Sequence, residues 1–165
     1  MRKMALLLIA LTVISVGFLS GCNEQNNNQN SSKTNYNIGE SITVGNIRYT
    51  FLSASWDTNY LGSEIYSLKV KGENLGNIQT TGIIAITQYK MENGYIYKHS
   101  ELGGWSIGAE FTINPGKEVI KTISSNSGEI DRDFLPVDKI YIEFRKESPS
   151  NPFSYIWIKS IVINV

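Results

Sequence analysis

The chain contains 165 residues with 15 basic and 15 acidic side chains, so its formal net charge is zero. This balance excludes the strongly basic surface on which nucleic-acid-binding domains depend. The chain holds one Cys and one His, which excludes an intramolecular disulfide and a zinc site built from Cys and His side chains.

The first 21 residues have the organisation of a secretory signal peptide. A short start carrying Arg2 and Lys3 precedes an apolar run over residues 4–19. This run has about the length of a signal peptide's apolar segment, and it is shorter than the roughly 20 apolar residues that a spanning helix needs. We therefore expect export, followed by removal of residues 1–21.

The residues at the expected cleavage site are Leu19-Ser20-Gly21-Cys22, and they resemble the lipobox of bacterial lipoproteins. The resemblance implies that Cys22 receives a diacylglycerol on its sulfur and that its freed amino group accepts a further acyl chain such as palmitate. A thioether would also remove a lone thiol from an oxidising compartment. We expect a lipid anchor on the extracytoplasmic face of the cell membrane and no other cofactor. An ordinary secreted protein with a chance Cys near its cleavage site is the alternative.

A polar segment follows the anchor, over residues 22–35. After Cys22 it contains no apolar side chain, so it cannot bury surface to offset the entropy of ordering. We interpret it as a flexible Asn-rich linker, with a polar cap of the fold as the alternative. Without the signal peptide the chain has 13 basic and 15 acidic residues, a net charge of −2. One domain, residues 36–165, remains.

A β-hairpin opens this domain. Residues 41–44 and 47–51 alternate polar and apolar side chains, and Gly45-Asn46 between them is a strong turn signal. After Phe51 the alternation shifts by one residue, which predicts a β-bulge near Ser53.

Further strands follow at short intervals. The predicted ranges are 64–71, 82–91, 95–97, 105–113, 119–123, 139–144 and 155–165. A continuous apolar run at 83–86 favours a strand covered on both faces, and a second phase shift occurs near Ser160. One helical turn over 130–135 is the single helical alternative. Eight or nine short strands predict an all-β domain, with two packed antiparallel sheets favoured over a barrel.

The opening of the domain resembles the telokin-like domain of Gram-positive lipoproteins that have no assigned function. Three turn motifs carry the resemblance, which spans residues 38–144. They are Gly39-Glu40, Asn74-Leu75-Gly76 and Pro115-Gly116-Lys117-Glu118. The resemblance implies an immunoglobulin-like β-sandwich, similar in fold to the mycobacterial immunoprotective extracellular antigen, and it supplies no catalytic residues. The last predicted strand, 155–165, departs from the pattern, so its place in the sheets stays open.

Few residues suggest catalysis or metal binding. His99 is the sole His, so a Ser-His-Asp triad would have to include it, and we expect it to be a loop residue. Glu129, Asp131 and Asp133 alternate and could offer oxygen ligands to calcium. They lack the spacing of an EF-hand loop, so we expect a solvated loop and no metal site.

Aromatic residues give the more suggestive signal. Tyr60 and Trp105 flank predicted loops, and loops on a rigid sandwich often carry binding. We expect most other Tyr and Trp side chains to pack in the core. The favoured function is a non-catalytic binding module at the cell surface, with a cell-envelope protein or glycan as partner. A small-ligand or metal-binding lipoprotein is the alternative, and a hydrolase is a remote one.

Overall fold

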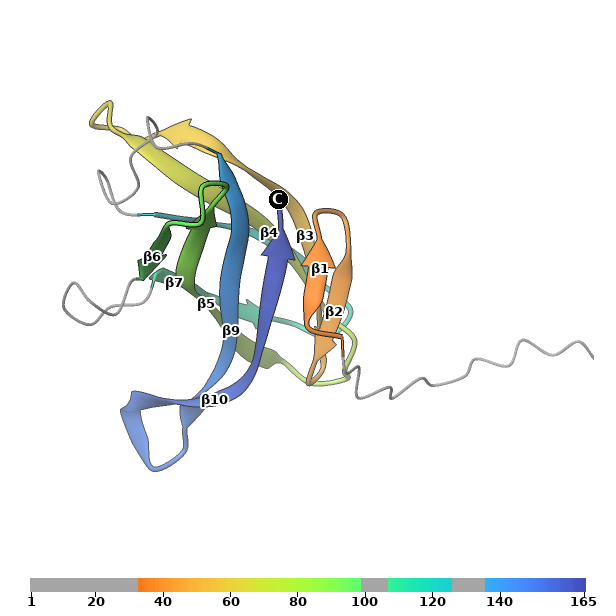
Figure 1. Ribbon diagram of the computed structural model, residues 1–165. Coiled ribbons are helices and arrows are strands. Elements are labelled where there is room, and N and C mark those ends of the chain that lie inside the picture. Colours follow the sequence, from red (N-terminus) through yellow and green to blue (C-terminus); the bar gives the residue numbers. More distant parts are fainter. Residues whose placement is uncertain (1–32, 99–106, 126–135) are drawn as a thin grey trace, which may run out of the picture. The chain divides into compact units, whose positions relative to one another are not determined.

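The computed structural model describes residues 33–98, 107–125 and 136–165, and every regular element in these ranges is a β-strand. Two sheets form, as Figure 1 shows. The predicted all-β sandwich is therefore confirmed. The described ranges contain no helix long and apolar enough to cross a membrane. The predicted signal peptide, lipobox and most of the linker lie outside the described residues, as does the helical turn considered at 130–135.

The larger sheet has six strands, and the smaller sheet has four. The larger one consists of β1 (Asn35–Asn37), β5 (Thr80–Met91), β6 (Ile96–Lys98), β7 (Ile107–Ile113), β9 (Val137–Ser148) and β10 (Asn151–Asn164). Its order is β1-β10-β9-β5-β6, with β7 also paired to β5. The smaller one consists of β2 (Ser41–Val44), β3 (Ile47–Thr58), β4 (Glu64–Asn74) and β8 (Glu118–Ser124), in the order β2-β3-β4-β8.

The predicted hairpin and bulge are both present. Val44 pairs with Ile47 across the Gly45-Asn46 turn, where Gly45 has a φ of +60° that suits a residue without a Cβ. The register between β3 and β4 shifts between Phe51 and Ser53, where the alternation changes phase. Local sequence pattern therefore determines this part of the smaller sheet.

The first strand was not predicted. Asn35, the last residue of the expected linker, already belongs to β1, and β1 pairs with β10 in parallel. The other described strand pairs are antiparallel. The structure also places the last predicted strand: β10 lies between β1 and β9 and contains a register shift between Trp157 and Lys159, close to the predicted phase shift.

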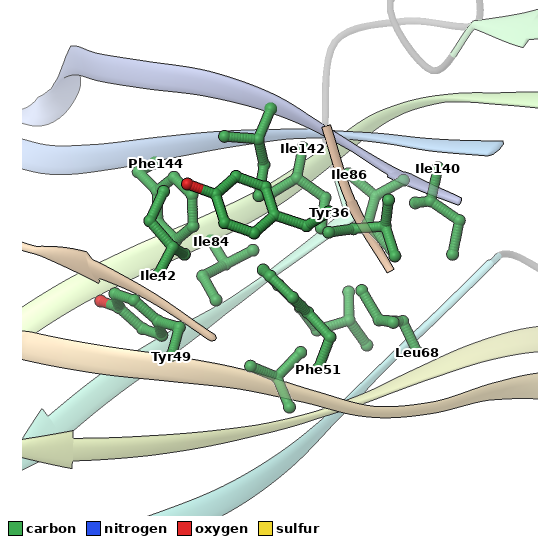
Figure 2. Packing of buried hydrophobic residues seen from close by; sticks show 14 of the residues in the cluster. Tyr36, Ile42, Tyr49, Phe51, Leu68, Ile84, Ile86, Ile140, Ile142 and Phe144 are labelled. Carbon is green, nitrogen blue, oxygen red and sulfur yellow. The ribbon is translucent and has the colours of Figure 1, made fainter. Parts of the chain in front are cut away.

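The core lies between the two sheets and consists of large apolar side chains. Figure 2 shows Ile84, Ile142 and Phe144 of the larger sheet facing Tyr49, Phe51 and Leu68 of the smaller one. The Tyr49 ring lies 5.0 Å from the Phe144 ring and 5.4 Å from the Phe111 ring, measured between centroids. Close aromatic contacts of this kind add to the free energy gained from burial.

Asn74 joins the turns at one end of the sandwich. Its side chain is 1% exposed, yet all of its polar atoms have partners. Its Nδ2 donates to the carbonyls of Ile78 (2.7 Å) and Ile113 (2.8 Å), and its Oδ1 accepts from the N–H of Gly76 (2.8 Å). Its main-chain N–H donates to the Lys117 carbonyl at 3.0 Å. Two of the three motifs behind the family resemblance thus meet at one structural node.

The remaining motif, Gly39-Glu40, also has a structural role. The Glu40 carboxylate accepts from the N–H of Asn37 and from Lys33 Nζ, both at 2.7 Å, and it closes the turn between β1 and β2. The Lys33 hydrogen bond, followed by the Asn37 N–H, lowers the pKa of Glu40 below its ordinary value. In addition, the Gly39 N–H donates to the carbonyl of Phe51 at 2.7 Å.

Candidate functional site

Tyr60 is the one predicted binding residue within the described ranges. It lies in the turn between β3 and β4, where its side chain is 94% exposed and that of Leu61 is 71% exposed. Five other candidate residues lie outside the described residues, namely His99, Trp105, Glu129, Asp131 and Asp133. The same holds for Leu19, Ser20, Gly21 and Cys22 of the lipobox.

Asn59 fixes the conformation of the β3–β4 turn. Its side-chain Oδ1 accepts from the N–H groups of Leu61 at 2.9 Å and Ser63 at 3.0 Å. Its main-chain N–H and carbonyl bond to Ser63 and Gly62, and Gly62 has a φ of +80°. These local bonds are of the kind by which Asn stabilises turns. The turn therefore holds two uncharged, mainly apolar side chains in solvent, an arrangement suited to contact with a partner.

The position of this turn follows from the length of β3. The strand has twelve residues, which corresponds to about 40 Å of extended chain. Its first residue, Ile47, adjoins the turn at Gly45-Asn46, and its last residue, Thr58, precedes the turn that carries Tyr60. Tyr60 therefore projects from the end of the sandwich opposite the Asn74 node.

A second exposed apolar group, which was not predicted, lies on β10. It consists of four large apolar residues with exposed side chains, Tyr155, Ile156, Trp157 and Ile158. The sequence signal is present, because four consecutive apolar residues leave neither face of a strand polar. We expected Trp157, like most aromatic residues, to pack in the core, but it is exposed. Trp56 does pack as expected, with its ring 5.3 Å from the Tyr66 ring between centroids.

Two hollows on the described surface are small. One, of about 220 Å³, is lined by residues that include Thr34, Glu143 and Ser160. Another, of about 170 Å³, lies between the sheets beside Gly45 and Ile158. Both are below the roughly 300–1,000 Å³ that is usual for small-molecule sites.

The described residues contain no group of three or more His, Cys, Asp or Glu side chains that could hold a metal ion. The largest pKa shifts with a stated cause belong to buried tyrosines of the core. Burial raises the pKa of Tyr66 to about 12 and raises that of Tyr49 further. These shifts follow from packing in the core. Tyr49 also lines the hollow of about 170 Å³, together with Arg145 and Lys146.

Comparison with known proteins adds little. No family model matches the chain, and no curated protein matches it. A solved structure, the yjhA protein of Bacillus subtilis from a structural genomics programme, aligns over 79% of this chain and 98% of its own length. The two chains are 14% identical and superpose with a TM-score of 0.40. Similarity at this level defines neither a shared family nor a shared function.

Proposed function

We propose that the protein is a lipid-anchored, non-catalytic binding module at the extracytoplasmic face of the cell membrane. The observation that carries the anchor is the sequence Leu19-Ser20-Gly21-Cys22 directly after an apolar segment of signal-peptide length. Two acyl chains would hold the chain firmly, since each buried methylene contributes about 0.8 kcal/mol and a single chain is marginal. The turn motifs that resemble the telokin-like lipoprotein domain support the same assignment.

The layout of the domain favours the β3–β4 turn as the binding site. The polypeptide preceding β1 enters beside β10, where the Thr34 carbonyl accepts from the Val162 N–H at 2.8 Å. Because β1 and β10 are parallel, this entering chain comes from the side on which β10 begins. Tyr60 and Leu61 project from the opposite end, so a tethered domain would present them away from the membrane.

The anchor is tested with Cys22→Ser in the native host. We expect the variant to accumulate with its signal peptide uncleaved or to leave the membrane fraction, whereas the wild type stays processed and membrane-bound. Ser20→Ala, which keeps a small residue before the cleavage site, serves as the matched control. Normal processing and normal membrane retention of Cys22→Ser would overturn the anchor.

Binding is tested with the soluble domain, residues 32–165, which is a compact unit. Envelope extracts are passed over immobilised wild type, over Tyr60→Ala/Leu61→Ser and over the exposed control Leu75→Ser. We expect saturable capture of a protein or glycan by the wild type and the control, and loss of that capture in the turn variant. No saturable capture, or equal capture by all three, would contradict a binding role for this turn.

A further inference from the structure

The hairpin of β9 and β10 extends beyond the rest of its sheet, as Figure 1 shows at the lower left. The pairing of β9 with β5 ends at Arg145, opposite Ile83, whereas its pairing with β10 continues to Ser148. We call this projecting part, residues 145–158, the arm. Its sequence Tyr155-Ile156-Trp157-Ile158 has side chains that are 40–60% exposed.

The β10 strand of the arm carries apolar side chains on both faces, whereas the β9 residues paired with it are Arg145, Lys146 and Glu147. Tyr155 and Trp157 are two residues apart and therefore share one face, while Ile156 points to the other. The indole Nε1 of Trp157 donates to Ser160 Oγ at 2.9 Å, which holds the ring along the strand. Ile158 lines the hollow beside the Gly45 turn. A soluble domain rarely leaves four consecutive large apolar side chains in water without a partner.

Along the arm, no described strand pairs with the outer edge of β10. Among the described strands, β1 is the one that pairs with this edge, and it covers Val162 to Asn164 alone. Exposed edges are usually protected by charged residues, but β10 contains one Lys and no Asp or Glu. A strand edge of this kind can pair with another chain or contact an apolar surface.

The chain that enters β1 indicates the occupant. Because β1 runs parallel to β10 and begins opposite Val162, Thr34 precedes it on the side on which the arm lies. Residues 23–32 lie between the proposed anchor Cys22 and this entry point, and ten residues span at most about 36 Å. With an anchor at Cys22, the arm would therefore lie at the end of the domain nearer the membrane.

We propose that the arm inserts Tyr155, Ile156 and Trp157 into the interface of the lipid bilayer that holds Cys22. This inference rests on the proposed lipid anchor. Trp and Tyr favour the boundary between headgroups and acyl chains, where an apolar ring is buried and a polar atom stays hydrated. Lys146 on the neighbouring strand pairs with Ile156 and would lie among anionic headgroups.

Because the anchor already holds the domain at the membrane, a weak contact between the arm and the bilayer is sufficient for insertion. A short flexible linker gives an attached group an effective concentration in the millimolar range, so the arm needs an intrinsic affinity of that order. Pairing with a second copy along the β10 edge is the competing arrangement. Antiparallel pairing of two such edges would point the two entering chains in opposite directions, whereas contact with the bilayer needs one direction, that of the anchor.

The test uses the mature chain from Cys22, produced without its signal peptide and coupled through its lone thiol to a maleimide lipid. The vesicles contain phosphatidylethanolamine and phosphatidylglycerol, with or without brominated acyl chains as fluorescence quenchers. The reporter keeps Trp157 and carries Trp56→Phe and Trp105→Phe. The control carries all three Trp→Phe changes together with Tyr60→Trp, which places the reporter at the opposite end. Urea unfolding confirms that both proteins are folded.

Brominated lipid is expected to lower the emission of Trp157 by about two-fold or more and to leave the reporter at position 60 within about 10% of its original emission. Absence of quenching at Trp157, or equal quenching at both positions, would overturn the proposal. A concentration-dependent dimer of the soluble domain that Trp157→Glu abolishes, without quenching by lipid, would instead assign the edge to self-pairing. Chemical coupling replaces cellular lipidation here, so this result is independent of the Cys22→Ser experiment.

Discussion

At the scale of single residues, Asn74 has the clearest energetic role in the structure. Its buried side chain satisfies the Ile78 and Ile113 carbonyls and the Gly76 N–H simultaneously. Replacement by Ala would leave the buried Ile113 carbonyl and two part-buried main-chain groups without that partner. Loss of a partner costs a buried group about 1–3 kcal/mol. The network explains the need for an Asn at position 74.

We expect Asn74→Ala to lower the free energy of unfolding by about 2–4 kcal/mol, with no change in the dependence on urea concentration. The matched control is Asn77→Ala, an exposed residue in the same loop. Its unfolding free energy should stay within about 0.5 kcal/mol of the wild type. Equal stability of the two variants would show that the Asn74 network is dispensable.

Buried tyrosines predict a loss of stability at high pH. Burial raises the pKa of Tyr66 from 10.0 to about 12, so the folded state keeps a proton that the unfolded state releases. The stabilisation is therefore complete below pH 10 and is lost as the pH rises towards 12. Urea midpoints measured from pH 8 to pH 11.5 should fall above pH 10, and Tyr66→Phe should make the fall shallower. A flat profile in the wild type would contradict the burial of this phenol.

At the scale of elements, β1 couples the entering chain to the core. It has three residues, and its central side chain, Tyr36, is 3% exposed and packs 6.3 Å from the Phe51 ring between centroids. The carbonyl of Thr34 and the pairing of Asn35–Asn37 with β10 add main-chain bonds. Any force on the proposed anchor would therefore reach the larger sheet through this short strand.

We expect Tyr36→Ala to lower the free energy of unfolding by about 3–5 kcal/mol, as removal of a buried aromatic ring usually does. Asn35→Ala, at the exposed neighbouring position, should have little effect. The measurement is urea unfolding followed by fluorescence. If both variants unfold like the wild type, β1 contributes nothing to the domain's stability.

Local pattern made the strands predictable, and nonlocal contacts account for what was missed. The hairpin at Gly45-Asn46 and the bulge at Ser53 depend on neighbouring residues, and both occur as expected. The strand β1 was missed because three residues with one apolar side chain show no period. Its parallel partner, β10, lies more than a hundred residues further along the chain.

The part of the candidate site that depends on local sequence was predictable, and the part that depends on nonlocal contacts was not. The turn residues around Asn59 and Gly62 favour an exposed loop tip, so the exposure of Tyr60 follows from local sequence. Exposure of Trp157 depends on how far β9 and β10 extend beyond β5, which is a property of the sheet and not of the strand. Periodicity identifies a strand but does not reveal what covers each of its faces.

At the scale of the whole molecule, the described domain has two distinct ends. The arm and the entering chain face one way, and the Tyr60 turn projects at the other end of β3. A tethered module needs this separation, because one end must approach the anchoring surface while the other stays accessible to a partner. The proposed anchor and the proposed binding turn are thus compatible with one orientation at a membrane.

The lipid anchor can be measured directly as the mass of the N-terminal peptide of the protein purified from its native membrane. We expect a mature chain that begins at Cys22 and carries the added mass of a diacylglycerol on sulfur, with or without a further acyl chain on the amino group. A chain that begins at another residue, or an unmodified Cys22, would contradict the lipid anchor from which the proposed orientation and function follow.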